Sequence, residues 1–151
     1  MTMIHKHIHL KRSVLVYALY IIHFSALMGM YLGYVQWFLS KTWAILFLIF
    51  LFLVDSLPQK NIKKLWPIPT IFFIGFLAEW LGVKFGFLFG DYSYGANLGI
   101  KIDDVPIIIG INWIILSLAT RGIIERFFEL PVMKILVSSV LMVSLDILIE
   151  P

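Results

Sequence analysis

Long apolar runs constrain this chain more than any other feature of its sequence. Short polar or proline-containing joins separate five such runs, which fall at about 13–37, 42–57, 67–88, 105–120 and 131–149. A segment that crosses the hydrocarbon core of a bilayer needs about 20 mostly apolar residues, and only helices and closed barrels satisfy their backbone there. The sequence therefore predicts an all-α protein: a polytopic transmembrane helical bundle of about five spans in a single membrane domain, residues 1–151.

The composition agrees with a chain whose solvent is lipid. Hydrophobic residues make up 61% of the 151 residues and charged residues only 14%, whereas an average soluble domain is about 25% charged. The sequence has no cysteine, which excludes disulfides, thiolate metal sites and thiol nucleophiles. The net charge of +3 comes without a dense basic cluster, so we expect no nucleic-acid partner.

The basic residues favour one orientation in the membrane. If the N-terminus is cytoplasmic, nine of the 12 lysines and arginines lie on the inner side, and the outer joins hold only Lys41, Lys84 and Lys101. Positive charge concentrates in the cytoplasmic loops of membrane proteins. The first apolar run is also longer than the 7–15 residues of a signal-peptide core, so we interpret it as a retained span. We therefore expect a multi-pass protein of the inner (plasma) membrane.

Residues 75–99 differ from the rest of the chain because they hold six of its ten glycines. Three of these are spaced four residues apart, at Gly82, Gly86 and Gly90. On one helix they would form a smooth face against which a second helix packs closely. Alternatively, they would break the helix and form a re-entrant segment near 86–99 that presents Asp91, Tyr92 and Tyr94 to a cavity. The residues alone leave both interpretations open.

Glu79 is the most informative single residue because it lies near the middle of the third apolar run. An acid at that depth costs about 2.5–3.5 kcal/mol on insertion scales, so we expect it to serve chemistry or an internal hydrogen bond that holds the bundle together. Three other runs each place one strongly polar side chain at a similar depth, namely His23, Asn112 and Asp146. This shared depth predicts a polar pocket between the helices.

Several short elements resemble, in their order, the bacterial and archaeal carotenoid biosynthesis protein family. The elements are Glu-Trp-Leu-Gly at 79–82, Phe-Gly-Asp-Tyr-Ser-Tyr at 89–94, Leu-Gly at 98–99, Val-Pro at 105–106, Trp113, and Asp-Ile-Leu-Ile-Glu-Pro at 146–151. The resemblance covers about residues 75–151, and the first two runs match only as hydrophobic segments. Members of the family continue past the acid-Pro pair into further membrane segments. We therefore expect a chain shortened at its C-terminus, whose activity at this length is a point for experiment.

Characterised members of that family are carotenoid hydratases that act on γ-carotene-type ends or on bisanhydrobacterioruberin. The resemblance implies a cofactor-independent hydro-lyase that adds water across the terminal isoprenoid double bond of an acyclic carotenoid end. Such a reaction needs an acid for the alkene carbon, a water to capture the tertiary cation, and a base for the released proton. A carboxyl group removed from water favours its neutral, proton-donating form, and aromatic faces stabilise a cation.

These requirements assign roles to the polar and aromatic residues of the family elements. We expect the acid to be Glu79 or Asp91, and the base to be Asp146 or Asp91. We expect the residues that line the substrate to be Trp80, Tyr92, Tyr94, Asn112 and Trp113. We expect no metal and no redox cofactor. His5, His7 and His9 alternate in a basic tail without further ligands nearby.

Two other classes of membrane protein stay open from the residues alone. A small-molecule or ion transporter also uses intramembrane acids and glycine-broken helices, although this sequence has no repeated half. A structural membrane subunit would use the glycine faces to pack against a partner. For the enzyme, the expected partners are the lipid bilayer, the carotenoid substrate, and, through helix packing, a second copy or other carotenoid enzymes.

Overall fold

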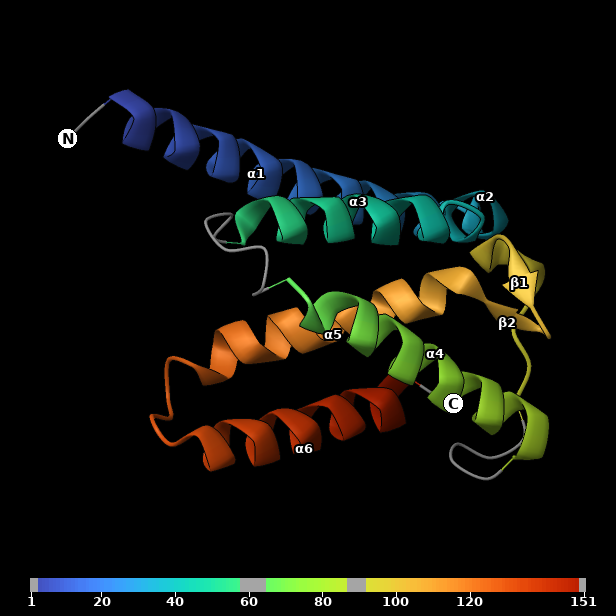
Figure 1. Ribbon diagram of the computed structural model, residues 1–151. Helices are drawn as coiled ribbons and strands as arrows, with labels where there is room; N and C mark the ends of the chain where they lie inside the picture. Colours follow the sequence, from blue (N-terminus) through green and yellow to red (C-terminus); the bar gives the residue numbers. More distant parts are fainter. Residues whose placement is uncertain (1–2, 58–64, 87–91, 150–151) are drawn as a thin grey trace. The chain divides into compact units, whose positions relative to one another are not determined.

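The computed structural model describes residues 3–57, 65–86 and 92–149, with side chains described from Ser13 to Leu145 within these ranges (Figure 1). The elements are α1 (Met3–Tyr31), α2 (Val35–Leu39), α3 (Thr42–Ser56), α4 (Pro67–Phe85), the short 3₁₀ helix η2 (Ala96–Leu98), β1 (Lys101–Ile102), β2 (Val105–Pro106), α5 (Ile107–Ile124) and α6 (Pro131–Ile149). The chain forms two compact units, Met1–Thr42 and Trp43–Pro151.

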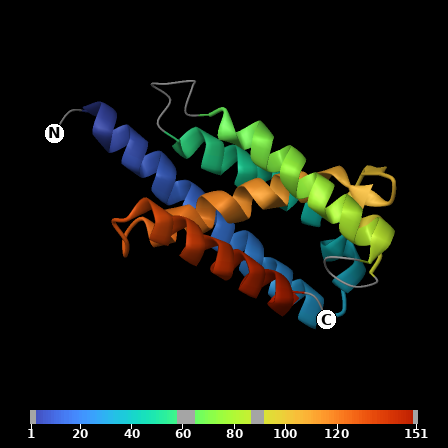
Figure 2. The same ribbon diagram turned by 60° about the horizontal axis from the view of Figure 1, so that its bottom comes forward.

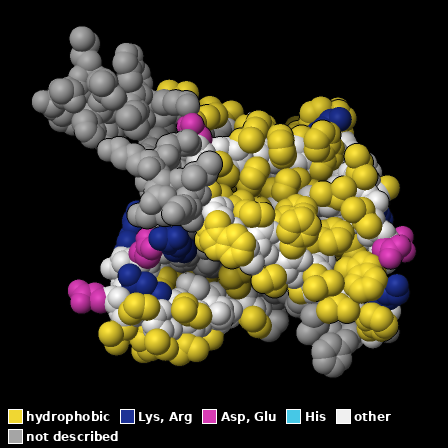
Figure 3. Space-filling view, in the orientation of Figure 1, with side chains coloured by type: hydrophobic (Ala, Val, Ile, Leu, Met, Phe, Trp, Pro, Cys, Tyr) yellow, Lys and Arg dark blue, Asp and Glu magenta, His cyan; other side chains and the backbone are white. Residues whose placement is uncertain are grey.

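The helices have the length and the surface of membrane spans. Within the described residues, four segments are long and apolar enough to cross a membrane: Ser13–Tyr31, Val35–Ser56, Pro67–Phe85 and Ile107–Ile124. Helix α6 adds a shorter apolar segment, Pro131–Leu145. Large hydrophobic side chains are exposed along all of these helices, and they cover much of the surface in view (Figure 3). The predicted helical membrane fold is confirmed, while the orientation of the N-terminus stays a prediction.

In the first unit, α1 ends at Tyr31, although the apolar run predicted a span that continues to residue 37. Gly33 has a φ of +95°, a conformation that glycine adopts without steric penalty, and the chain turns there into α2. A Cβ atom on Gly29 would lie 1.8 Å from Cε2 of Phe38, so this glycine allows the α2 side chain to lie against α1. Hydrophobicity alone could not reveal this turn, because both sides of it are equally apolar.

In the second unit, α5 packs against α4 on one side and α6 on the other (Figure 2). A Cβ atom on Gly75 of α4 would lie 2.3 Å from Cγ of Trp113 in α5. Reciprocally, a Cβ atom on Gly110 of α5 would lie 2.6 Å from Cε2 of Phe72 in α4. Each helix therefore places a large aromatic side chain over a glycine of the other, which allows the two backbones to approach closely.

Helix α4 ends at Phe85, and Gly86 caps it in the left-handed conformation, with a φ of +61°. The N–H of Gly86 donates to the carbonyl oxygen of Gly82 at 2.8 Å. Of the two interpretations of the glycine-rich segment, the helix break is therefore the one that the structure contains at Gly86. The following residues, 87–91, lie outside the described residues, and re-entry of the segment into the membrane stays a prediction.

A small antiparallel hairpin of β1 and β2 connects the loop after α4 to α5 (Figure 1). Lys101 pairs with Pro106 in its register. The two residues of its turn, Asp103 and Asp104, have φ values of +46° and +68°, which aspartate tolerates better than most residues. Val105 and Pro106 are fully buried, so the second strand is part of the packed interior.

Candidate functional site

The buried face of α4 carries Glu79 between two glycines. Gly75, Glu79 and Gly82 are the buried residues of this helix, and their spacing of four and three residues places them on one side of it. Glu79 is only 5% exposed. The lack of a side chain at Gly75 leaves room for Trp113 of α5 to pack beside it.

Three hydrogen-bond donors converge on the Glu79 carboxylate. The hydroxyls of Tyr92 and Tyr94 both donate to Oε2, at 2.6 and 2.8 Å. The indole Nε1 of Trp113 donates to Oε1 at 3.1 Å. The two phenol rings meet edge to face, with 5.5 Å between their centroids and 84° between their planes. A polar group this deeply buried needs such partners to offset its lost hydration.

All three of these donors are neutral groups. No lysine, arginine or histidine among the described side chains forms an ion pair with Glu79. Tyr94 lies in the loop between α4 and α5, outside the spans; its burial, and then the negative charge of Glu79, raise the pKa of Tyr94 far above its usual value. The Tyr94 hydroxyl therefore remains a hydrogen-bond donor at physiological pH, and the cluster holds one carboxyl group in largely apolar surroundings.

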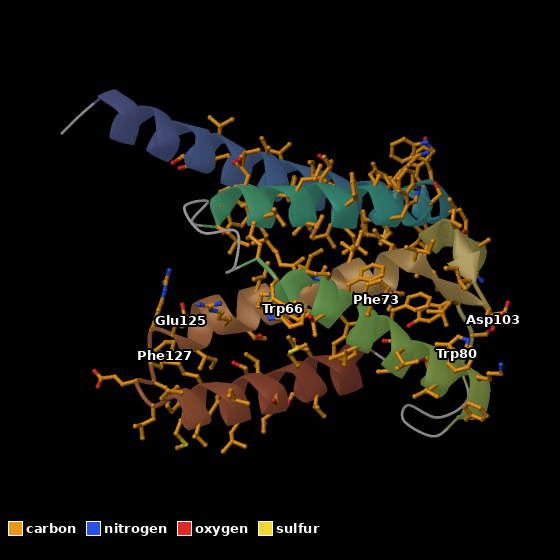
Figure 4. The ribbon with its side chains drawn as sticks, in the orientation of Figure 1. Trp66, Phe73, Trp80, Asp103, Glu125 and Phe127 are labelled. Carbon is orange, nitrogen blue, oxygen red and sulfur yellow. The ribbon has the colours of Figure 1, made fainter. Side chains whose placement is uncertain are left out.

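The hairpin is attached to both sides of this cluster. Trp80, the neighbour of Glu79, donates from its Nε1 to Oδ2 of Asp103 at 3.1 Å (Figure 4). The Nζ atom of Lys84 lies 4.5 Å from the centroid of the same indole ring. On the other side, the Nζ atom of Lys101 donates to the backbone carbonyl oxygen of Tyr94. The hairpin thus contacts the helix turn that carries Glu79 and also the loop that supplies the phenols.

The structure brings together four of the residues that the sequence predicted for the site, namely Glu79, Tyr92, Tyr94 and Trp113. Trp80 points instead to the hairpin. Asn112 is half-buried, and its side chain has no hydrogen bond to another described residue. Asp91 lies outside the described residues, and only the helical backbone is described for Asp146. His23 belongs to the first unit, where it bonds a carbonyl of its own helix.

Lys101 and Asp103 are two contacts of the site that the sequence reasoning missed, because both were counted only as loop charges. One signal was available in the sequence. Lys-Ile-Asp-Asp-Val-Pro at 101–106 places two aspartates between short apolar stretches, which is the pattern of a two-residue hairpin turn.

A groove of about 600 Å³ opens between α5 and α6 and includes Ile71 of α4 in its wall. Ser117 lines this groove one helical turn after Trp113, and Ile71 lies one turn before Gly75. The groove therefore begins about one turn, or roughly 5 Å, from the packing contact beneath the carboxylate cluster. Lys134 lies at its far end, and most of the exposed lining is apolar.

The fold and the site define a helical membrane protein that holds one buried carboxyl group under two phenols and an indole. Among known protein families, the one described as "Carotenoid biosynthesis protein" matches residues 16–151. The chain belongs to this family and therefore has a role in carotenoid biosynthesis. The match also covers the first two apolar runs, which had resembled the family only as hydrophobic segments. No curated protein and no solved structure matches the chain.

Proposed function

We propose that this protein adds water across the terminal isoprenoid double bond of an acyclic carotenoid end and forms a tertiary alcohol. Membership of the carotenoid biosynthesis family supports the class of substrate. The observation that carries the proposal is the buried Glu79 carboxyl group with its partners Tyr92, Tyr94 and Trp113. The carbon–carbon π bond breaks while one C–H and one C–O bond form from water. The reaction has no net oxidation or reduction and needs no redox cofactor.

In this mechanism Glu79 protonates the less substituted carbon of the double bond, which leaves the positive charge on the tertiary carbon. The donors from Tyr92, Tyr94 and Trp113 are aimed at the negative charge that develops on the carboxyl group as the proton leaves. The low exposure of Glu79 keeps bulk water from competing for that proton. The same aromatic rings offer π faces to the cation.

A water molecule then captures the cation, and a carboxylate takes up the proton that this water releases. The candidates for this base remain Asp91 and Asp146, chosen from the sequence. The ionised Glu79 is itself a third group able to accept a proton, and its return to the neutral form would complete the cycle.

The groove between α5 and α6 supports a long, linear and apolar substrate. A polyene drawn from the bilayer would lie along the apolar wall that includes Ile71, with its end directed toward Glu79. Because the carboxyl group is almost completely covered, the end of the polyene must displace a phenol ring or the Trp113 indole before it touches Glu79. We expect the loop that carries Tyr92 and Tyr94 to provide this movement, since loops move more readily than packed helices.

Expression in a bacterial host that accumulates acyclic carotenoids tests the proposal, with pigments identified by mass spectrometry. We expect the mass of one water to be gained for each hydrated end. Glu79→Gln should abolish this gain at equal expression, whereas Glu129→Gln, which alters an exposed carboxylate of the α5–α6 join, should retain it. Full activity of Glu79→Gln would remove Glu79 from the chemistry, and no mass gain with the wild-type chain would contradict the proposal.

Assays of the same wild-type and variant proteins distinguish the enzyme from the two other classes of function. Proton or ion flux in liposomes, together with unchanged pigments in the host, would favour a transporter. Unchanged pigment production in Glu79→Gln, combined with loss of assembly in Gly86→Leu, would favour a structural subunit.

A further inference from the structure

The β1–β2 hairpin connects all three segments that supply hydrogen bonds to Glu79 or carry it. We infer that Lys101 and Asp103 are positioning residues, which hold this hairpin so that the phenols and the indole meet on the carboxyl group. The catalytic role of the cluster rests on the proposed function. The role of the hairpin in holding the cluster together rests only on the contacts of the hairpin.

Lys101 fixes the loop that supplies the phenols. Its half-buried ammonium group donates to the backbone carbonyl of Tyr94, while the hydroxyl of the same tyrosine donates to Glu79. Tyr94 is therefore held at both ends, by the hairpin at its backbone and by the carboxyl group at its phenol. A hydrogen bond from a charged donor is stronger and more directional than one between neutral groups.

Asp103 fixes the hairpin to the helix that carries the carboxyl group. Its Oδ2 accepts a hydrogen bond from Nε1 of Trp80, which is the residue after Glu79 in α4. The backbone of Asp103 and Asp104 adds an independent observation, since both have positive φ values that glycine or asparagine usually adopts in such turns. An aspartate that occupies such a turn and also accepts a specific hydrogen bond is expected to contribute through its side chain.

The hairpin also determines where α5 begins, and with it the place of Trp113. Val105 and Pro106 are fully buried, and helix α5 starts at the next residue. The N–H of Ile107 donates to the carbonyl oxygen of Ile100 at 2.9 Å, which ties the first residue of α5 back across the hairpin. A shift of the hairpin would therefore move the phenols and the indole relative to Glu79.

Two pairs of variants distinguish the hydrogen bonds of Lys101 and Asp103 from the packing of these side chains. Lys101→Met keeps the aliphatic stem but removes the donor, and Lys101→Arg restores a cationic donor. Asp103→Gly removes the acceptor while relieving the positive φ, and Asp103→Asn keeps an acceptor and tolerates that φ. Lys41→Met, which changes an exposed lysine of the first unit, serves as the control for loss of a lysine charge. Helix content and a single peak in size-exclusion chromatography establish folding.

The first readout is nitration of tyrosines by tetranitromethane, located by peptide mass spectrometry in the purified protein. The exposed Tyr31 provides the internal standard. We expect Tyr94 nitration to rise about tenfold in Lys101→Met and in Asp103→Gly, because each loses one fixing hydrogen bond. The Lys101→Arg, Asp103→Asn and Lys41→Met variants should react as the wild type does.

The second readout is hydration of carotenoid in nanodiscs. Lys101→Met and Asp103→Gly should lower kcat about tenfold with little change in KM, and the two conservative variants should restore it. Unchanged Tyr94 nitration in both Lys101→Met and Asp103→Gly would overturn the inference, as would equal effects of each disruptive variant and its conservative counterpart. If nitration responds as expected but the wild type hydrates no carotenoid, the positioning role stands and the proposed reaction fails.

Discussion

Replacement of Gly75 by alanine should weaken the packing of α4 against α5 and displace Trp113 from Glu79. The new Cβ atom would lie 2.3 Å from Cγ and 2.6 Å from Cβ of Trp113. These distances are shorter than a normal carbon–carbon contact by roughly 1 Å or more. Because the backbone fixes the position of the Trp113 Cβ atom, a change of rotamer cannot relieve the overlap with that atom, and the helices must move apart.

The size of the effect follows from three contributions. Overpacking of this kind costs about 1–3 kcal/mol, and the better helix propensity of alanine returns up to about 1 kcal/mol. Displacement of Trp113 also weakens its hydrogen bond to Glu79, and bonds to charged groups contribute about 1.5–3 kcal/mol when intact. We therefore expect a net destabilisation of about 2 kcal/mol in Gly75→Ala.

Two glycines of α5 give a graded comparison of the cost of an added Cβ atom. A Cβ atom on Gly110 would meet the outer edge of the Phe72 ring, which can rotate away, so Gly110→Ala should cost about 1 kcal/mol or less. A Cβ atom on Gly122 would meet nothing within 4 Å, so Gly122→Ala should be neutral or slightly stabilising. This variant is the matched control for a change of helix propensity without contact.

Unfolding of the purified protein by SDS titration, followed by circular dichroism, measures this series. We expect Gly122→Ala to be the most stable variant, Gly110→Ala the next and Gly75→Ala the least stable. Equal stability of the Gly75 and Gly122 variants would refute the close approach of α4 and α5 at Trp113. Near-ultraviolet circular dichroism should also change in Gly75→Ala, because the indole of Trp113 loses its fixed surroundings.

Three further predictions concern the charged and phenolic groups. Tyr92→Phe removes one donor from Oε2 of Glu79 and should lower kcat about tenfold or more, measured by pigment hydration. The pKa of Tyr94 is raised in the folded state, so the contribution of this tyrosine to stability is fully present below the usual tyrosine pKa of about 10 and is lost as the pH rises above that value. Unfolding titrations across that pH range should show this loss of stability. The loss should be smaller in Tyr94→Phe. Glu125→Gln breaks an exposed pair with Arg121 and removes a weaker attraction to Lys134, and it should change the unfolding free energy by less than about 0.5 kcal/mol in the same titration.

Much of the fold was predictable because apolar length is a direct requirement of the bilayer. The features that could not be predicted are those that apolar length does not determine. The end of α1 depends on the positive φ of Gly33, and apolar residues on both sides of the turn give no indication of it. The β1–β2 hairpin is too short to show the alternating pattern by which strands are usually recognised.

The candidate site was predictable in part for a similar reason. Glu79 stands out because an acid within an apolar run is costly, and that cost does not depend on knowing the fold. The contact of Trp113 with it depends on the packing of α5 on Gly75, which the spacing of residues along one chain does not determine. Trp80 was expected in the lining because it follows Glu79, yet successive residues of a helix point about 100° apart, and its indole reaches Asp103 instead.

The three donors divide unequally between the two oxygens of Glu79. An ionised carboxylate has about four lone-pair positions. The two phenols occupy both positions of Oε2, and the indole occupies one of the two on Oε1. One position of Oε1 therefore has no donor among the described residues. A proton or a water that binds the carboxyl group without replacing one of the three donors must therefore bind at Oε1, whereas the end of a polyene must first displace one of the rings.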